Sequence, residues 1–190
     1  MKQSISLQPG FSLIEVLVTL LVTTIGVLGM VALQGRSIQY TQDAAQRNAA
    51  VELANEYVEL MRSAPQLIYQ RRPPAFPMNA GLVGTSSLYK EGGKVFDDEE
   101  DCVAIDGKVP TSIKQLRDCW IERAIQRLPG GEDVFTDYSY ICRSTTPGTC
   151  STSQGAMVEI RLAWRVPDGG CLDANSPSSS ICTYTLRVQP

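Results

Sequence analysis

The sequence contains no histidine in its 190 residues. That absence excludes the Ser-His-Asp triad, the Cys-His catalytic pair and the common zinc sites that use histidine. The chain also lacks the Gly-Lys-Ser or Gly-Lys-Thr sequence that ends a phosphate-binding loop, and it has no Cys-x-x-Cys pair. We therefore expect neither an enzyme nor a protein that carries a cofactor or a metal.

Positive charge is also scarce, with 17 Lys and Arg against 20 Asp and Glu, a net charge of -3. No basic stripe is present, and the acidic run at residues 97–101 would repel phosphates. These features exclude nucleic acid as a partner. The spacing of the acidic run does not match an EF-hand loop, so we expect a solvated acidic loop rather than a cation site.

Charge is almost absent from residues 11–35, where Glu15 is the single ionisable side chain. The apolar run at 16–33 could cross roughly 27 Å of hydrocarbon as a helix, close to the thickness of a bilayer core. A carboxylate inside such a segment is costly and indicates a functional site. The alternative is that Glu15 only reaches the lipid headgroups from near the helix end.

The leader at residues 1–10 carries one charged side chain, Lys2. This weakly positive flank predicts an amino terminus in the cytoplasm and, beyond Arg36, a chain on the far side of the membrane. The apolar run is longer than that of a secretory signal peptide, and no convincing Ala-x-Ala site follows it. We expect the run to be retained as a membrane segment.

Residues 10–15 read Gly-Phe-Ser-Leu-Ile-Glu and lead directly into the apolar run. This arrangement resembles the class III signal of type IV pilins and pseudopilins. The resemblance implies that prepilin peptidase cuts after Gly10 and methylates the new amino terminus of Phe11. It also implies that Glu15 pairs with the Phe11 amino group of a neighbouring subunit during assembly.

No proline occurs between Phe11 and Ala64, which predicts one helix that ends at Pro65. Its outer half has a polar face and an apolar arc wider than a single packing layer needs. The polar positions are Glu52, Asn55, Glu56, Glu59 and Arg62, and the apolar ones are Ala49, Leu53, Ala54, Tyr57, Val58, Leu60 and Met61. Either the arc covers the chain's own domain and also a neighbour, or the helix lies deep in its own domain.

The remaining sequence predicts an α+β head. Residues 65–110 lack periodicity and form a long irregular connection, and a second helix follows at 111–128 with Thr111 or Ser112 as its cap and Trp120 in the core. Strands are expected at 134–142, 156–166 and 182–189 in an antiparallel meander, one face of which the long helix covers.

We therefore expect a leader at 1–10, a transmembrane and amphipathic helix at 11–64, and a periplasmic globular head at 65–190. An amino-terminal helix packed on an antiparallel sheet of about three or four strands again resembles the type IV pilin fold.

Six cysteines lie in the part predicted to be outside the cytoplasm. An even number in that setting indicates disulfides, although six cysteines allow 15 pairings. We expect the sequential set, in which each bond closes a loop beside a predicted helix or strand and stabilises the fold by about 2–4 kcal/mol. The pairs are Cys102 with Cys119, Cys142 with Cys150, and Cys171 with Cys182.

Five further segments resemble minor pilins of the type IV pilus, namely 25–30, 119–120, 140–144, 160–165 and 184–188. The resemblance implies a subunit that primes pilus assembly and sits at the pilus tip, supporting twitching motility and adhesion. Its implied partners are prepilin peptidase, other minor pilins and the major pilin, a tip adhesin, the assembly platform and the inner membrane. The implied location is first the inner membrane, with one pass and a periplasmic head, and then the pilus tip.

Two rival functions remain open. A type II secretion pseudopilin would share every amino-terminal feature and act at the tip of a periplasmic pseudopilus. A membrane-anchored periplasmic enzyme would need a cluster of acid, base or nucleophile candidates, and the sequence offers only ordinary surface carboxylates.

Overall fold

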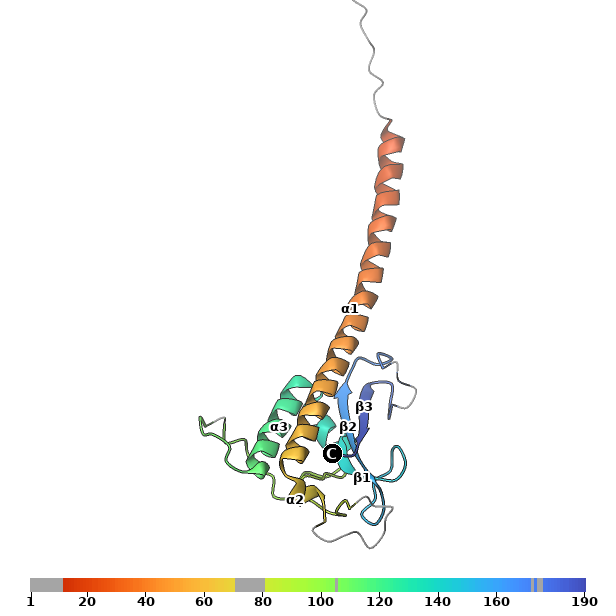
Figure 1. The fold of residues 1–190 in the computed structure, drawn as a ribbon. Coiled ribbons are helices and arrows are strands. Elements are labelled where there is room, and N and C mark those ends of the chain that lie inside the picture. Colours follow the sequence, from red (N-terminus) through yellow and green to blue (C-terminus); the bar gives the residue numbers. More distant parts are fainter. Residues whose placement is uncertain (1–11, 71–80, 105, 172, 174–175) are drawn as a thin grey trace, which may run out of the picture. The chain divides into compact units, whose positions relative to one another are not determined.

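The computed structural model describes residues 12–70, 81–104, 106–171, 173 and 176–190. The chain forms two compact units, Met1–Gln42 and Asp43–Pro190. Helix α1, Leu13–Ser63, begins in the first unit and ends in the second (Figure 1). The prediction of one helix without a break up to Pro65 is confirmed.

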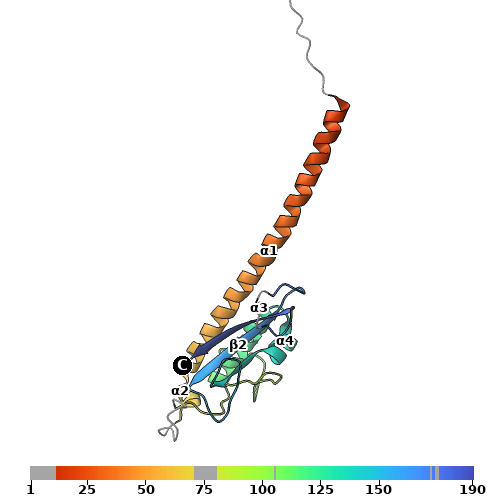
Figure 2. The ribbon, with the colours of Figure 1, turned by 90° about the vertical axis from the view of Figure 1, so that its right-hand side faces the viewer.

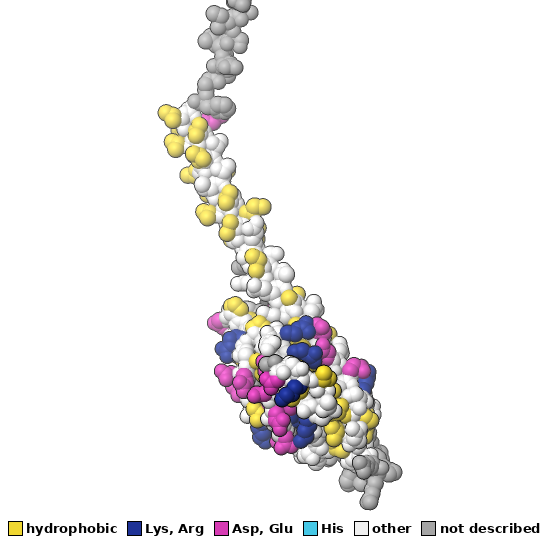
Figure 3. Space-filling model, turned by 90° about the vertical axis from the view of Figure 1, so that its left-hand side faces the viewer, with side chains coloured by type: hydrophobic (Ala, Val, Ile, Leu, Met, Phe, Trp, Pro, Cys, Tyr) yellow, Lys and Arg dark blue, Asp and Glu magenta, His cyan; other side chains and the backbone are white. Residues whose placement is uncertain are grey.

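In the first unit, α1 exposes its large apolar side chains, and Figure 3 shows those on the side that faces the viewer. Its threonine hydroxyls bond back to backbone carbonyls one turn earlier, as in the 2.9 Å bond from Thr19 Oγ1 to the Val16 oxygen and the 2.8 Å bond from Thr24 Oγ1 to the Leu21 oxygen. Such bonds satisfy hydroxyls in a setting without water. Among the described residues, α1 alone is long and apolar enough to cross a membrane, with a mean hydropathy of 2.5 in its most apolar window.

In the second unit, the end of α1 buries one face in the core. Its buried residues are Ala50, Leu53, Ala54, Tyr57, Val58 and Met61, whereas Glu52, Asn55, Glu59 and Arg62 are exposed. Ala49 and Leu60 at the edge of the arc are half-buried. The apolar arc is thus used mainly within its own domain, which favours the second of the two alternatives that the sequence left open.

Three antiparallel strands form the sheet in the order β1-β2-β3, namely β1 Tyr140–Ser144, β2 Met157–Arg165 and β3 Ile181–Val188. Figure 2 shows β2 and β3 side by side. The side chains of Val158, Ile160, Leu162 and Trp164 are fully buried in one core cluster with the buried face of α1. The predicted meander and its inward face are confirmed.

The expected strand at 134–142 is wrong over its first half. Helix α4, Gly131–Tyr138, occupies that part, and it follows Gly130 in a left-handed conformation with φ 118°. Val134 packs with Ala163 and Ile181, on the sheet face opposite Trp164. Contact with the sheet therefore outweighs the strand preference of this aromatic and β-branched segment. It also means that both faces of the sheet are partly covered, not one.

Helix α3, Ile113–Arg127, lies beside the end of α1 (Figure 1). Ser112 caps it by accepting a 3.2 Å hydrogen bond from the Gln115 N–H, as one of the two expected caps. Ion pairs link α3 to α1 at Arg127–Glu52, 2.5 Å, and Arg123–Glu56, 3.4 Å. A short helix, α2, spans Pro65–Ile68 after α1 ends.

Three buried cations hold the irregular connection that follows residue 81. Each donates to backbone carbonyls of segments far apart in the sequence: Lys90 to Thr136 and Ser139, Arg117 to Ser87, Asp97 and Asp98, and Arg143 to Leu82, Ser151 and Thr152. Because buried carbonyls without a partner are costly, these side chains replace the regular hydrogen bonding that a loop lacks.

Candidate functional site

Glu15 lies in the first turn of α1, and its N–H donates to the Ser12 oxygen at 3.0 Å. The residue is exposed, and no described residue forms an ion pair with its carboxylate. The free N–H groups of a first turn favour a negative charge there, although such a charge still lacks a counter-ion in lipid. The predicted processing residues Gly10 and Phe11 lie outside the described residues.

Among the described residues, the largest exposed apolar surface lies on the first unit. Its exposed side chains are Leu13, Ile14, Val16, Leu17, Val18, Leu20, Leu21, Val22, Ile25, Val27, Leu28, Met30, Val31, Leu33, Ile38 and Tyr40. A contiguous apolar surface of this extent is not stable against water and needs lipid or other helices around it. The segment is thus suited both to a bilayer and to a bundle of like helices.

The six cysteines form three disulfides in the second unit. Cys102 is joined to Cys119, Cys142 to Cys150, and Cys171 to Cys182, with Cα separations of 4.4, 5.5 and 5.3 Å. This is the sequential set. The first bond ties the end of the acidic run to α3, and the other two tie loops to β1 and β3.

The acidic run at 97–101 is exposed to solvent. Asp98 pairs with Lys114 at 2.7 Å, and this contact keeps the pKa of Asp98 below its usual range. Among the described residues, no group of three or more His, Cys, Asp or Glu side chains is placed to hold a metal ion.

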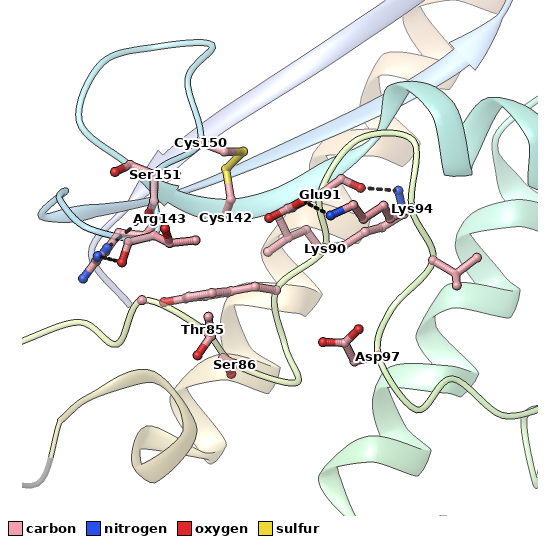
Figure 4. A pocket seen from close by; sticks show the side chains of 15 residues that line it. Thr85, Ser86, Lys90, Glu91, Lys94, Asp97, Cys142, Arg143, Cys150 and Ser151 are labelled. Carbon is pink, nitrogen blue, oxygen red and sulfur yellow. Dashed lines mark hydrogen bonds and ion pairs between the residues drawn. A yellow bond between two sulfur atoms is a disulfide. The ribbon is translucent and has the colours of Figure 1, made fainter.

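A pocket of about 350 Å³ in the second unit was not predicted. It lies between residues 84–97, β1 and residues 150–152 (Figure 4). Its lining residues come from an irregular connection, β1 and a loop, and no sequence period relates these three segments. Only the three-dimensional arrangement brings them together.

Residues 5–31 match a family model, the prokaryotic N-terminal methylation motif. That match supports a type IV pilin-like protein. It implies processing by prepilin peptidase and assembly with other pilins, and it suggests a structural protein rather than an enzyme. No curated protein and no solved structure matches the chain.

The long apolar helix, the disulfides and the motif together fit a membrane-anchored pilin or pseudopilin. The α+β head, with the end of α1 packed on a three-stranded antiparallel sheet, is consistent with the type IV pilin fold.

Proposed function

We propose that the protein is a minor pilin similar to PilV, the type IV pilus modification protein. It joins other minor pilins in a membrane complex that primes assembly of the pilus and then sits at the tip. In that position it contacts the major pilin on one side and a tip adhesin on the other, and it supports twitching motility and adhesion. The observation that carries the proposal is the methylation motif in register with Glu15 and the exposed apolar helix.

The head supports this choice over a type II secretion pseudopilin. Three of the segments that resemble minor pilins coincide with strands: 140–144 is β1, 160–165 lies in β2, and 184–188 lies in β3. A fourth, Cys119-Trp120, supplies one disulfide and a buried core ring. The resemblance therefore covers structural positions throughout the head as well as the amino terminus.

Processing and location follow from the same proposal. Prepilin peptidase removes residues 1–10 after Gly10, and Phe11 becomes the methylated first residue. The helix at 11–64 then holds the subunit in the inner membrane by one pass, with the head, 65–190, in the periplasm. The assembly platform extracts the subunit into the filament, where the apolar surface of α1 exchanges lipid for neighbouring helices.

Glu15 sets the register of that packing. A carboxylate among apolar helices costs several kcal/mol unless an opposite charge meets it. The amino group of Phe11 on a neighbouring subunit supplies the charge, and only one axial offset between two helices brings the pair together. Pairing thus offsets the cost of burial and selects the offset.

Deletion of the protein in its native host tests the proposal. We expect loss of surface pili and of twitching motility, with secretion through the type II pathway unchanged. Restoration by the wild-type chain is the control. Lost secretion with intact pili would contradict a role in the pilus.

The role of Glu15 is tested by Glu15→Val, with Glu15→Asp as the matched control that keeps the charge. The amount of each variant in sheared filaments, relative to its amount in membranes, is measured by immunoblotting. We expect Glu15→Val to reach the membrane, because the helix becomes more apolar, and to be depleted from filaments. Equal incorporation of Glu15→Val and wild type would rule out the pairing.

A further inference from the structure

A second pocket of the head, of about 550 Å³, is lined by all three strands of the sheet. Tyr140 of β1, Arg161 of β2 and Thr185 of β3 line it, and these residues lie directly opposite one another in the register of the sheet. Successive side chains of a strand point to opposite faces, so these three share the face opposite Trp164. We call this the outer face.

The outer face carries one buried acid, Glu159, two positions before Arg161 on β2. Both of its carboxylate oxygens are already used. Oε1 accepts from the Tyr140 hydroxyl at 2.7 Å and from the Gly148 N–H at 2.8 Å, while Oε2 accepts from the Ser144 hydroxyl at 3.0 Å and lies 3.2 Å from Arg187 Nε. Glu159 is thus neutralised by Arg187, and no described residue forms an ion pair with Arg161.

The side chain of Arg161 is held in place but not covered. Its guanidinium carbon lies 5.5 Å from the centroid of the Tyr140 ring, and its Nε is enclosed and has no hydrogen-bond partner among the described residues. A ligand therefore does not reach Nε. Because the residue as a whole is only half-buried, the part that faces the pocket is the end of the guanidinium with its two terminal nitrogens. Two such nitrogens form a planar fork that matches a carboxylate or a phosphate.

Thr185 adds a donor beside this fork. It is exposed, and side chains directly opposite in an antiparallel pair have Cβ atoms about 4.5–5.5 Å apart. No hydrogen bond between described residues uses its hydroxyl. The fork of Arg161 and the hydroxyl of Thr185 can therefore contact the same group.

The other charges of the lining leave Arg161 as the cation that can meet an anion. The charged lining residues described are Arg47, Arg161 and a single acid, Asp173. Arg47 lies 4.0 Å from Asp43, and Asp173 takes part in interactions within the chain. A neutral ligand would leave Arg161 without a counter-ion, whereas an anion supplies one.

We propose that Arg161 and Thr185 bind an oxyanion group, a carboxylate or a phosphate, of a small ligand. The two terminal nitrogens of Arg161 donate to two oxygens of that group, and the Thr185 hydroxyl donates to one of them. The volume of the pocket leaves room for the rest of a molecule the size of an acidic or phosphorylated sugar. The proposal goes beyond assembly of the filament, and binding by the purified chain does not depend on the pilus.

The test is an NMR titration of the full chain in micelles of a non-ionic detergent, at constant ionic strength. The probes are inorganic phosphate and glucuronate, with glucose as the neutral comparison. We expect saturable shifts of the backbone amide signals around Arg161 and Thr185 with at least one anion and none with glucose. A response to glucuronate alone would assign the site to carboxylates, and a response to phosphate alone to phosphorylated ligands. No saturable response to either anion, or an equal one to glucose, would overturn the proposal.

Variants of Arg161 localise the binding. Arg161→Gln should weaken it at least tenfold, because it removes charged hydrogen bonds to the ligand. Arg161→Lys keeps the charge without the fork and should bind with an affinity between those of Arg161→Gln and wild type. Arg165→Gln is the control, since Arg165 is an exposed arginine on the same strand and the same face but does not line the pocket. Wild-type affinity in Arg161→Gln, or an equal loss in Arg165→Gln, would rule out this site.

Thr185→Val tests the site without removing a charge. Thr185 is exposed and valine favours strands, so the variant should keep the thermal midpoint of wild type. Its affinity for the anion should fall about threefold, because one hydroxyl donor is lost. Thermal unfolding of each variant separates loss of binding from loss of the fold. Wild-type affinity in Thr185→Val would contradict the contact of its hydroxyl with the anion.

Discussion

The indole N–H of Trp120 donates to the backbone oxygen of Leu53 at 3.0 Å, which bonds α3 directly to α1 inside the core. The centroid of the Trp120 ring also lies 4.4 Å from the centroid of the Tyr57 ring. The Tyr57 hydroxyl donates a hydrogen bond to the Leu88 backbone oxygen at 2.8 Å. These contacts connect both helices with the irregular connection. Trp120 therefore links α3, α1 and, through Tyr57, the irregular connection in the core of the head.

Replacement of Trp120 by Phe should lower the free energy of unfolding by about 2 kcal/mol, because it removes the hydrogen bond and leaves a cavity. The measurement is urea unfolding followed by circular dichroism. Leu116→Ala is the matched control on the same helix. Leu116 is 41% exposed, so its loss should cost less than about 1 kcal/mol. An equal cost for both variants would contradict a central role for Trp120.

Arg117 is fully buried and pairs with Asp118 at 2.6 Å while it donates to three backbone oxygens of the connection. Arg117→Met should destabilise the head by about 3–5 kcal/mol, because it leaves the Asp118 charge and those oxygens without their partner. Hydrogen exchange should rise first at residues 87–101. The measurement is mass-spectrometric exchange together with urea unfolding.

Arg123→Met is the control for Arg117→Met. Arg123 lies on the same helix, but it is exposed and pairs with Glu56 at 3.4 Å. Exposed ion pairs contribute about 0–1 kcal/mol, so this variant should resemble wild type. Unchanged exchange at 87–101 in Arg117→Met would show that the connection does not depend on this cation.

Much of the fold could be predicted because hydrophobic periodicity is a local signal. The alternation of Val158, Ile160 and Leu162 and the caps of α3 depend on near neighbours in the sequence. Val134 and Phe135 have strand-forming side chains, yet they lie in α4 because their contacts with Ala163 and Trp120 come from distant segments. The intrinsic preference of a residue for helix or strand carries no information about such contacts with distant segments.

The same distinction applies to the candidate sites. Glu15 and its apolar run form a contiguous motif, so the sequence displays it in full. The pocket around Tyr89 is assembled from residues 84–97 and 141–152, which are more than forty positions apart, and the cations Lys90 and Arg143 beside it have no pattern that marks them as buried. Whether a single charged side chain is buried depends on which backbone carbonyls the fold places around it to accept its hydrogen bonds.

Lys90 predicts a pH dependence of stability. Burial lowers the pKa of Lys90 from 10.5 to about 8. Between these values the unfolded chain keeps a proton that the folded chain has lost, so the free energy of unfolding should rise with pH. Below about pH 8 both states are protonated and this contribution is constant. Above pH 10 the neutral tyrosines Tyr89 and Tyr140, with pKa values of about 12, oppose the rise.

The rise should therefore be measured between about pH 8 and pH 10, by urea unfolding of wild type and of Lys90→Met. Lys90→Met should be less stable at every pH but should lack the rise. Lys94→Met is the control, because Lys94 is exposed and Glu91 raises the pKa of its ammonium above 10.5, outside this window. A Lys90→Met curve parallel to that of wild type would assign the rise to another group.

The Cys102–Cys119 disulfide closes the longest loop of the three, with a sequence separation of 17. It joins the end of the acidic run to the middle of α3, next to Trp120. Replacement of both cysteines by serine should lower the free energy of unfolding by about 3 kcal/mol, since the unfolded chain regains the freedom of that loop. Urea unfolding without a reductant measures the loss.

The comparison is the double variant Cys142→Ser, Cys150→Ser, whose disulfide has a sequence separation of 8. Its free energy of unfolding should fall by slightly less, because the shorter loop regains less conformational entropy in the unfolded chain. A Cys102→Ser, Cys119→Ser protein as stable as wild type would show that Arg117 and the core around Trp120 already hold this segment.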